Sequence, residues 1–334
     1  MWAYIARRLV LLVFVLFGVS ILTFTISHLI PADPARYAAG LEATPEQVEA
    51  LRKELGLDLP PPVQYVRYLT NLLRGDLGYS IASRRPVLED LKDYLPATLE
   101  LVVVAYLFTV IGGVIAGVVS ATSRGKITDY LTRIPIIAGT GTPMFWLALM
   151  GQLTLYYSWD LLPFGGRIDK LADPPAAASG FFLIDTLLVG DYDLFRQTLH
   201  HIAMPAVVLA IGRMAIITRL TRASMLETLN NDFVRTARSK GLTERIVVYR
   251  HALKVAFIPV LTELGLQFGW MLAGTIVVES VFAWPGLGRY AFHAIQFQDL
   301  PAIMGVTLAL TFFKVLSNLF VDVFYVVIDP RIRL

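Results

Sequence analysis

The sequence of 334 residues contains no cysteine, which excludes disulfide frameworks, thiolate metal sites and cysteine nucleophiles. Charge is also scarce. Asp, Glu, Lys and Arg make up 16% of the residues, whereas apolar and aromatic residues make up 56%. A soluble globular chain carries about 25% charged residues, so too little charge is present to cover a core of this size in water. The same composition excludes disorder and collagen-like repeats, and it predicts an integral membrane protein.

Six stretches can be assigned as membrane spans, each of which needs about 20 helical residues. The first runs from Leu9 to Ala32 without a charge. A signal peptide is the alternative interpretation, but the stretch is long for one and no clear cleavage site follows it. The remaining spans are expected between 100 and 124, between 133 and 160, and at about 202–220, 257–282 and 302–327. The last three contain charged residues, so buried soluble helices compete with membrane spans there.

The placement of Lys and Arg decides between these interpretations. With six spans, residues 1–8, 123–133, 219–256 and 328–334 fall on one side of the membrane and hold 15 Lys or Arg residues. The short segments on the other side, 159–201 and 284–301, hold four. Since basic residues favour the inner side, the sequence predicts six helices with both termini in the cytoplasm.

The segment 31–97 is predicted to be a small helical insertion on the outer side. Thr44 and Gln47 have the spacing of a capping box, with Pro45 at the first helical position. A second helix is expected over 61–73, a tight turn at Gly75–Ser80, and a third short helix over 86–95 that ends at Pro96. The insertion is interpreted either as a cap on the membrane helices or as a docking surface for an external partner.

Two adjacent histidines lie on the outer side, at the entrance of a helix. His200 and His201 diverge by about 100° on that helix, so we interpret them as interfacial polar residues and not as a metal site.

Two prolines, Pro135 and Pro143, lie in the expected third span. They serve there either as a flexing point or in packing alone.

The loop between the fourth and fifth spans is unusually basic. Its pattern predicts a helix through Leu229, a polar turn at 230–232, and a short helix over about 233–240. Gly241 then fits the position after the helix, where a positive φ is favourable. A short amphipathic helix between two sharp turns suits a groove on another protein. Topology and contact with anionic lipid are the alternative roles for its basic residues.

The chain shows no phosphate-binding loop. Around Gly125 and Lys126 the motif would require glycine at Ser120 and Ser or Thr at Ile127. Energy for any transport must therefore come from another subunit or from an ion gradient.

Several motifs together resemble one family. DFVRTARSKGL (232–242) followed by RHALKVAFIP (250–259) is similar to the cytoplasmic EAA loop of ABC-importer permeases. RRLVLLVFVLFGVSILTF, GDLGYS, SMLE, ESVFAWPGLGR and NLFVDVFYVVIDPRIR extend the match over nearly the whole chain. The chain resembles B-type permease subunits of the dipeptide, oligopeptide and nickel importers. It has Arg235-Thr236-Ala237 where many permeases have Glu-Ala-Ala, which is the variant of the peptide subfamily.

The resemblance implies an all-α type I (MetI-like) permease bundle in the bacterial inner membrane. It implies an N-terminal helix (1–30), a periplasmic insertion (31–97), a permease core (98–327) and a cytoplasmic tail (328–334). The partners it implies are a second, C-type permease subunit, two ABC ATPase subunits that bind ATP and Mg, a periplasmic or extracellular solute-binding protein, and membrane lipid. No catalytic residue, metal, cofactor or nucleic acid is expected for this chain.

The resemblance also assigns the ATPase-coupling helix to ten residues of the basic loop. These are Asp232, Phe233, Val234, Arg235, Thr236, Ala237, Arg238, Ser239, Lys240 and Gly241.

Polar residues within the expected spans are candidates for the translocation path. On the fifth span, Trp270 lies three residues after Gln267. On the sixth span, Asn318 lies four residues after Lys314, so each pair shares one face of its helix. Pairing between helices is the alternative, with Lys314 bonded to Glu279 or Asp322.

The sequence leaves other substrates open and argues against other classes of protein. Glutathione and nickel are alternative substrates to dipeptides and oligopeptides. A stand-alone secondary transporter would require internal repeats and embedded ion ligands, a membrane enzyme a paired acid and base, and a channel a repeated filter sequence. None of these is recognisable in the sequence.

Overall fold

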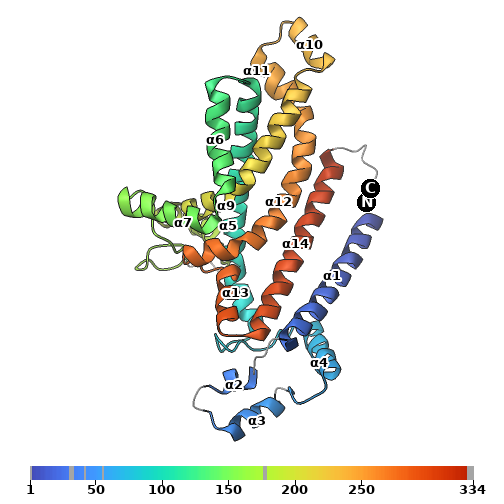
Figure 1. Cartoon of the computed structure of the whole chain (residues 1–334), viewed down its shortest axis with the longest axis vertical. Helices are drawn as coiled ribbons and strands as arrows, with labels where there is room; N and C mark the ends of the chain where they lie inside the picture. The colour runs from blue at the N-terminus through green and yellow to red at the C-terminus, as the bar shows by residue number, and fades with distance from the viewer. Residues whose placement is uncertain (1, 30–33, 41–42, 55, 176–178, 329–334) are drawn as a thin grey trace. The chain divides into compact units, whose positions relative to one another are not determined.

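The computed structural model describes residues 2–29, 34–40, 43–54, 56–175 and 179–328, and their regular structure is helical (Figure 1). Within those residues the backbone pairs in β fashion only at an isolated bridge between Tyr79 and Pro86. The chain divides into two compact units, one of residues 1–98 with 285–334 and one of residues 99–284. One boundary, between residues 98 and 99, falls within a long helix, and the other, between residues 284 and 285, falls between two helices.

The first unit contains the two terminal membrane helices and the predicted insertion. Ser20 of the first helix contacts the hydroxyl of Tyr65 at 2.9 Å, which joins that helix to the insertion. The helices of this unit are α1 (Trp2–Leu29), α2 (Pro34–Ala39), α3 (Pro45–Glu54), α4 (Pro61–Leu73), the start of α5 (Val87–Thr122), α13 (Leu287–Gln296) and α14 (Leu300–Ile328).

The capping box of the insertion is confirmed by its hydrogen bonds. The Thr44 N–H donates to the Gln47 side chain at 2.9 Å, and the Gln47 N–H donates to Thr44 Oγ1 at 3.3 Å. The turn after α4 is also as predicted. Gly75 and Gly78 have positive φ, and Asp76 Oδ1 accepts the Gly78 N–H at 2.8 Å.

The prediction that a short helix ends at Pro96 is wrong, because Pro96 lies inside α5. A proline in a helix removes one backbone donor, here the one that would bond the carbonyl of Lys92. Lys92 is exposed, so water can satisfy that carbonyl. Membrane helices tolerate proline where the freed group finds another partner.

The second unit is a bundle around α9 and α12, which pack along each other. Its helices are the rest of α5, α6 (Ile127–Gly141), α7 (Met144–Gly151), η1 (Gln152–Ser158), α8 (Phe182–Val189), α9 (Tyr192–Thr228), α10 (Asp232–Ser239), α11 (Glu244–Ile246), η2 (Val247–Ala252) and α12 (Leu253–Val281). The two η segments are π-helical turns.

Small residues let α5 and α9 approach closely. Gly113 and Gly117 have the small-xxx-small spacing of close membrane-helix contacts. A Cβ at Gly117 would lie 2.5 Å from the Cβ of Thr221, and one at Gly113 would lie 2.8 Å from Ile217. Thr218 Oγ1 donates to the Gly113 carbonyl at 3.2 Å across the same contact. The close approach therefore requires glycine at both positions.

Among the residues that the structure describes, five helical segments are long and apolar enough to cross a membrane: Ala6–Leu29, Val87–Thr122, Tyr192–Thr228, Glu244–Val281 and Leu300–Leu319. Many apolar side chains on α1 are exposed, including Val13 at 66% and Phe14 at 67%, as expected of a surface that faces lipid.

The third expected span is not one straight helix. Ile127–Gly141 and Met144–Ser158 meet at an angle of 113°, and they make a sixth span only if this broken pair counts as one. The break lies at Pro143 and not at Pro135, which is inside α6. Thr142 has an extended backbone, which is the conformation favoured before proline.

Candidate functional site

The basic loop folds as predicted, with α10 held between two turns. The N–H of Leu229 bonds the Met225 carbonyl at the end of α9, and α10 begins three residues later. Gly241 follows the helix with φ of +77°. In Figure 1, α10 lies at one end of its unit, beside α11.

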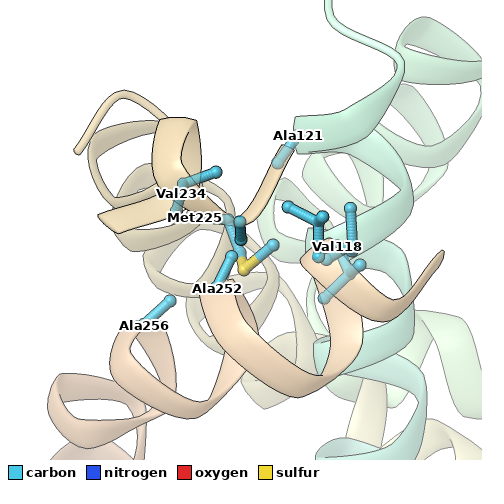
Figure 2. Packing of buried hydrophobic residues seen from close by; sticks show 9 residues of the cluster. Val118, Ala121, Met225, Val234, Ala252 and Ala256 are labelled. Atoms are coloured by element: carbon cyan, nitrogen blue, oxygen red, sulfur yellow. The ribbon is translucent and has the colours of Figure 1, made fainter. Parts of the chain in front are cut away.

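One face of α10 is buried in an apolar cluster. Val234 is fully buried and Ala237 is 6% exposed. Figure 2 shows the cluster from close by, with Met225 of α9 beside Val234. Its members come from α5, α9, α10, η2 and α12: Val118, Ala121, Met225, Val234, Ala237, Val247, Val248, Ala252 and Ala256. All these elements meet under α10, so α10 packs directly against α5, α9 and α12.

The other face of α10 is open. The side chains of Asp232 and Arg235 are 96% and 74% exposed, and Phe233 is 41% exposed. Leu242, Ile246 and Tyr249 add further exposed apolar surface after the helix. Aromatic, apolar and Arg side chains together are typical of protein interfaces.

A bidentate ion pair fixes the end of α10 to the next element. Arg238 donates through Nε to Glu244 at 3.1 Å and through Nη2 at 2.7 Å. This hydrogen bond raises the pKa of Arg238 above its usual value. Paired N–H donors on one carboxylate fix orientation as well as distance, so the pair orients the end of α10 relative to α11.

Two of the four predicted path residues lie on α12. Gln267 is 2% exposed. Its amide nitrogen donates to the carboxylate of Glu263, while its carbonyl oxygen has no partner in the part of the chain that the structure describes. Trp270 is 52% exposed, and its ring lies 5.8 Å from the guanidinium carbon of Arg213 on α9. Arg213 is the residue that sequence reasoning missed, because it was treated only as an interruption of a span.

The other two predicted path residues lie on α14, in the other unit. Lys314 is exposed and Asn318 is half-buried. The two pairs of predicted path residues therefore belong to different units. The side chain of Asp322, the alternative partner of Lys314, lies outside the described residues.

A buried ion pair near the predicted outer end of the second unit was also missed. Arg167 Nη2 lies 2.5 Å from Glu100 Oε2, and the two side chains are 6% and 4% exposed. Glu100 also accepts the Leu183 N–H at 2.7 Å, and the Arg167 guanidinium lies 3.6 Å from the centroid of the Phe182 ring. Burial lowers the pKa of Arg167, which the nearby Glu100 carboxylate opposes.

The segment around Arg167 is tied to the ends of α9 and α12. The Gly166 N–H donates to the Phe282 carbonyl at 2.8 Å, and Gln152 donates to the carbonyls of Phe164 and Val281. His201 contacts the Gly165 carbonyl at 3.0 Å and Asp169 at 3.1 Å. No group of three or more His, Asp or Glu residues able to hold a metal ion occurs among the residues described.

These features are those of a helical membrane protein in which one short helix is packed on one face and exposed on the other. Two family models match the chain. Residues 113–334 match the binding-protein-dependent transport system inner membrane component, and residues 1–102 match the N-terminal part of such membrane components.

Full-length relatives agree with this match. The dipeptide transport system permease DppB of Alkalihalophilus pseudofirmus is 44% identical over 333 residues, which cover all of both chains. The probable D,D-dipeptide transport system permease DdpB of Escherichia coli is 46% identical over 332 residues, which are 99% of this chain and 97% of that one. A glutathione transport system permease, GsiC of Escherichia coli, is 38% identical over 330 residues, which are 99% of this chain and 98% of that one.

The chain belongs to the family of binding-protein-dependent transport system inner membrane components. The resemblance to the permeases of peptide importers and the all-α type I bundle are both confirmed. Membership means a multi-pass permease of an ABC importer, which works with ATPase and binding-protein components.

Proposed function

We propose that this chain is the B-type permease subunit of an importer for dipeptides, with no ATPase activity of its own. The observation that carries the proposal is α10, a helix anchored on one face by three membrane helices and open on the other. A partner that moves α10 also moves the bundle, which is what an ATP-driven permease requires. The two dipeptide permeases reported above favour the substrate.

The proposed assembly contains a second, C-type permease, two cytoplasmic ATPases that bind ATP and Mg, and an external solute-binding protein. In this arrangement both termini and α10 are cytoplasmic. The exposed face of α10, with Asp232, Phe233 and Arg235, docks in a groove of one ATPase.

The proposed path uses polar groups within the spans. The carbonyl oxygen of Gln267 has no partner among the described residues, but it is buried, so it can accept the N–H of a peptide bond only after the helices around it move apart. Trp270 and Arg213 offer an aromatic face and a cation on neighbouring helices. Lys314 and Asn318 of α14 are the remaining members. Contacts of this kind bind a zwitterionic peptide only weakly as it passes. Selection among substrates is then made by the binding protein.

Glutathione is the second candidate substrate, supported by the relative at 38% identity. Glutathione is itself a peptide, so the same polar groups suit it. Nickel, which the sequence motifs left open, is a third possibility for the test.

The test is uptake into proteoliposomes that contain this chain with the permease, ATPases and binding protein encoded beside it. We expect uptake of a labelled dipeptide that depends on ATP, with excess unlabelled dipeptide competing and glutathione or nickel not competing. Competition by glutathione or nickel, without competition by unlabelled dipeptide, would overturn the assignment of dipeptides as the substrate. Uptake by the chain alone, driven by an ion gradient, would overturn the assignment of function and favour a secondary transporter.

A further inference from the structure

A cavity with three arginines lies between α6 and α9 in the second unit. Its volume is about 250 Å³, and it is lined by Arg133, Ile136, Thr218, Arg219, Arg222 and Ala223. The first two residues come from α6 and the other four from α9. Both helices belong to the same compact unit, and they pack against each other.

One carboxylate, that of Asp129, lies close to these arginines, and its oxygens are already engaged. The hydroxyl of Ser120 and the N–H of Gly125 donate to it. Arg222 donates to both oxygens, through Nε at 3.3 Å and Nη2 at 3.2 Å. Arg133 Nη1 lies 4.0 Å from the same group. Asp129 thus neutralises about one of the three cations.

The remaining positive charge is directed at a partly apolar cavity. Arg219 forms no ion pair among the described residues and is exposed. Ile136 and Thr218 are 8% and 2% exposed, so the wall between the arginines is buried. The side chains of Arg133 and Arg222 are 41% and 23% exposed. Several donors with uncompensated charge around one cavity form a site for an anion, and guanidinium groups match the geometry of phosphate oxygens.

The place of the cavity in the chain indicates where the anion comes from. Arg133 lies where the third span was predicted to begin, and Arg219 where the fourth was predicted to end. Both positions are at the basic, cytoplasmic boundary of the bilayer in the proposed orientation, where anionic headgroups are concentrated. The site depends on this membrane placement and not on the identity of the transported substrate.

We propose that this cavity binds a phosphate group, supplied by an anionic phospholipid of the inner leaflet. The bound phosphate joins α6 to α9 through Arg133 and Arg219. Met225 follows Arg222 by three residues on α9 and packs under α10 in the apolar cluster. Occupancy of the site therefore stabilises the position of α9 on which α10 rests, and it links the lipid composition of the membrane to coupling.

The test uses the full chain, purified in detergent and exchanged into phosphatidylcholine vesicles that contain or lack phosphatidylglycerol. Arg133→Gln and Arg219→Gln remove one donor from each helix and leave the Asp129–Arg222 pair in place. Arg124→Gln is the matched control, because Arg124 is exposed in the turn between α5 and α6 and does not line the cavity. The readouts are the phosphatidylglycerol that remains bound after detergent extraction and the thermal midpoint of each variant.

We expect the affinity for phosphatidylglycerol to fall about tenfold in either cavity variant and to stay at the wild-type level in the control. The lipid should raise the thermal midpoint of the wild type and the control but not of the cavity variants. If inorganic phosphate alone gives the same arginine-dependent rise while phosphatidylglycerol does not, the phosphate site stands and its source is soluble. Equal lipid retention and equal midpoints in all four proteins would show that the cavity binds no phosphate.

Discussion

At the residue scale, Glu100 and Arg167 form a buried ion pair. Each partner is less than 10% exposed, so neither charge is solvated by water. Removal of one partner from such a pair leaves an uncompensated buried charge. The Arg167 guanidinium also lies over the Phe182 ring, which adds a contact that a lysine would not reproduce.

Arg167→Ala is expected to lower the free energy of unfolding by about 3–5 kcal/mol, because Glu100 is left charged and buried. Thermal unfolding of the purified chain in detergent measures this loss. The double variant Glu100→Gln with Arg167→Met should recover most of it, since no charge then stays unpaired. Arg196→Ala, at an exposed position, is the control and should change stability by less than about 0.5 kcal/mol. A loss in the control equal to that in Arg167→Ala would contradict the account.

Trp270→Ala is expected to slow peptide uptake about threefold while the ATPase response to the binding protein is retained. The ring is exposed on α12 and lies over Arg213, so its loss removes a face of the proposed path. Uptake and ATP hydrolysis are measured in the same proteoliposomes. Trp159→Ala, which removes an exposed tryptophan outside the spans, should leave both rates unchanged. Equal slowing of hydrolysis and uptake in Trp270→Ala would instead indicate a structural role.

Residues close in the chain were easier to predict than residues far apart. The Thr44–Gln47 capping box could be predicted because its two hydrogen bonds join residues three positions apart. Glu100 and Arg167 are separated by 67 positions, and nothing in either local sequence signals the other. The contact of Arg213 with Trp270 depends on the packing of α9 against α12 and was missed for the same reason.

At the scale of elements, the predictions that held are those set by backbone chemistry. Gly241 has the positive φ expected after a helix, and α10 has nearly the predicted limits. The prediction that failed concerns a proline. Pro96 was predicted to end a helix but is accommodated inside α5, whereas the break at Pro143 falls at one of the two prolines that were given as a flexing point or as packing residues. Local sequence alone does not say whether neighbouring groups will satisfy the carbonyl that a proline leaves free.

Gly241→Pro and Arg235→Glu are each expected to abolish ATPase coupling without preventing membrane insertion. Proline cannot adopt the φ of +77° at position 241, so the turn that follows α10 could not form as it does in the wild type. Arg235 is 74% exposed, and reversal of its charge should cost little stability but weaken docking about tenfold or more. Uptake and co-purification of the ATPases are the measurements.

Gly190→Pro is the matched control for Gly241→Pro. Gly190 also ends a helix with positive φ, +79°, and no neighbour lies within 4 Å of a Cβ at either glycine. Gly190→Pro should strain the backbone as much as Gly241→Pro does, yet leave ATPase binding intact. Wild-type transport by Gly241→Pro or by Arg235→Glu would contradict the assignment of α10 as the coupling helix.

At the scale of the whole molecule, α1 and α10 expose different kinds of surface, which suit different roles. Apolar side chains on α1 are exposed, and α10 exposes Asp232, Phe233 and Arg235. In the proposed mechanism, a partner that moves α10 acts on α5, α9 and α12 through one apolar cluster. The close glycine contacts between α5 and α9 would then favour a joint movement of those two helices. A helix packed on one face and closely packed helices together suit a protein that is moved by a partner.

The orientation of the chain in the membrane can be tested by labelling single introduced cysteines. Because the sequence has no cysteine, no other thiol of the chain reacts. Ser239→Cys places one thiol on α10, and Ser83→Cys places one in the segment that follows the GDLGYS turn. In the proposed orientation a membrane-impermeant maleimide labels Ser83→Cys in intact cells, whereas Ser239→Cys is labelled only after the membrane is opened. Addition of the ATPases should then protect Ser239→Cys and leave Ser83→Cys reactive. Labelling of Ser239→Cys in intact cells would place α10 outside, where no ATPase can reach it, and would remove the basis for coupling through this helix.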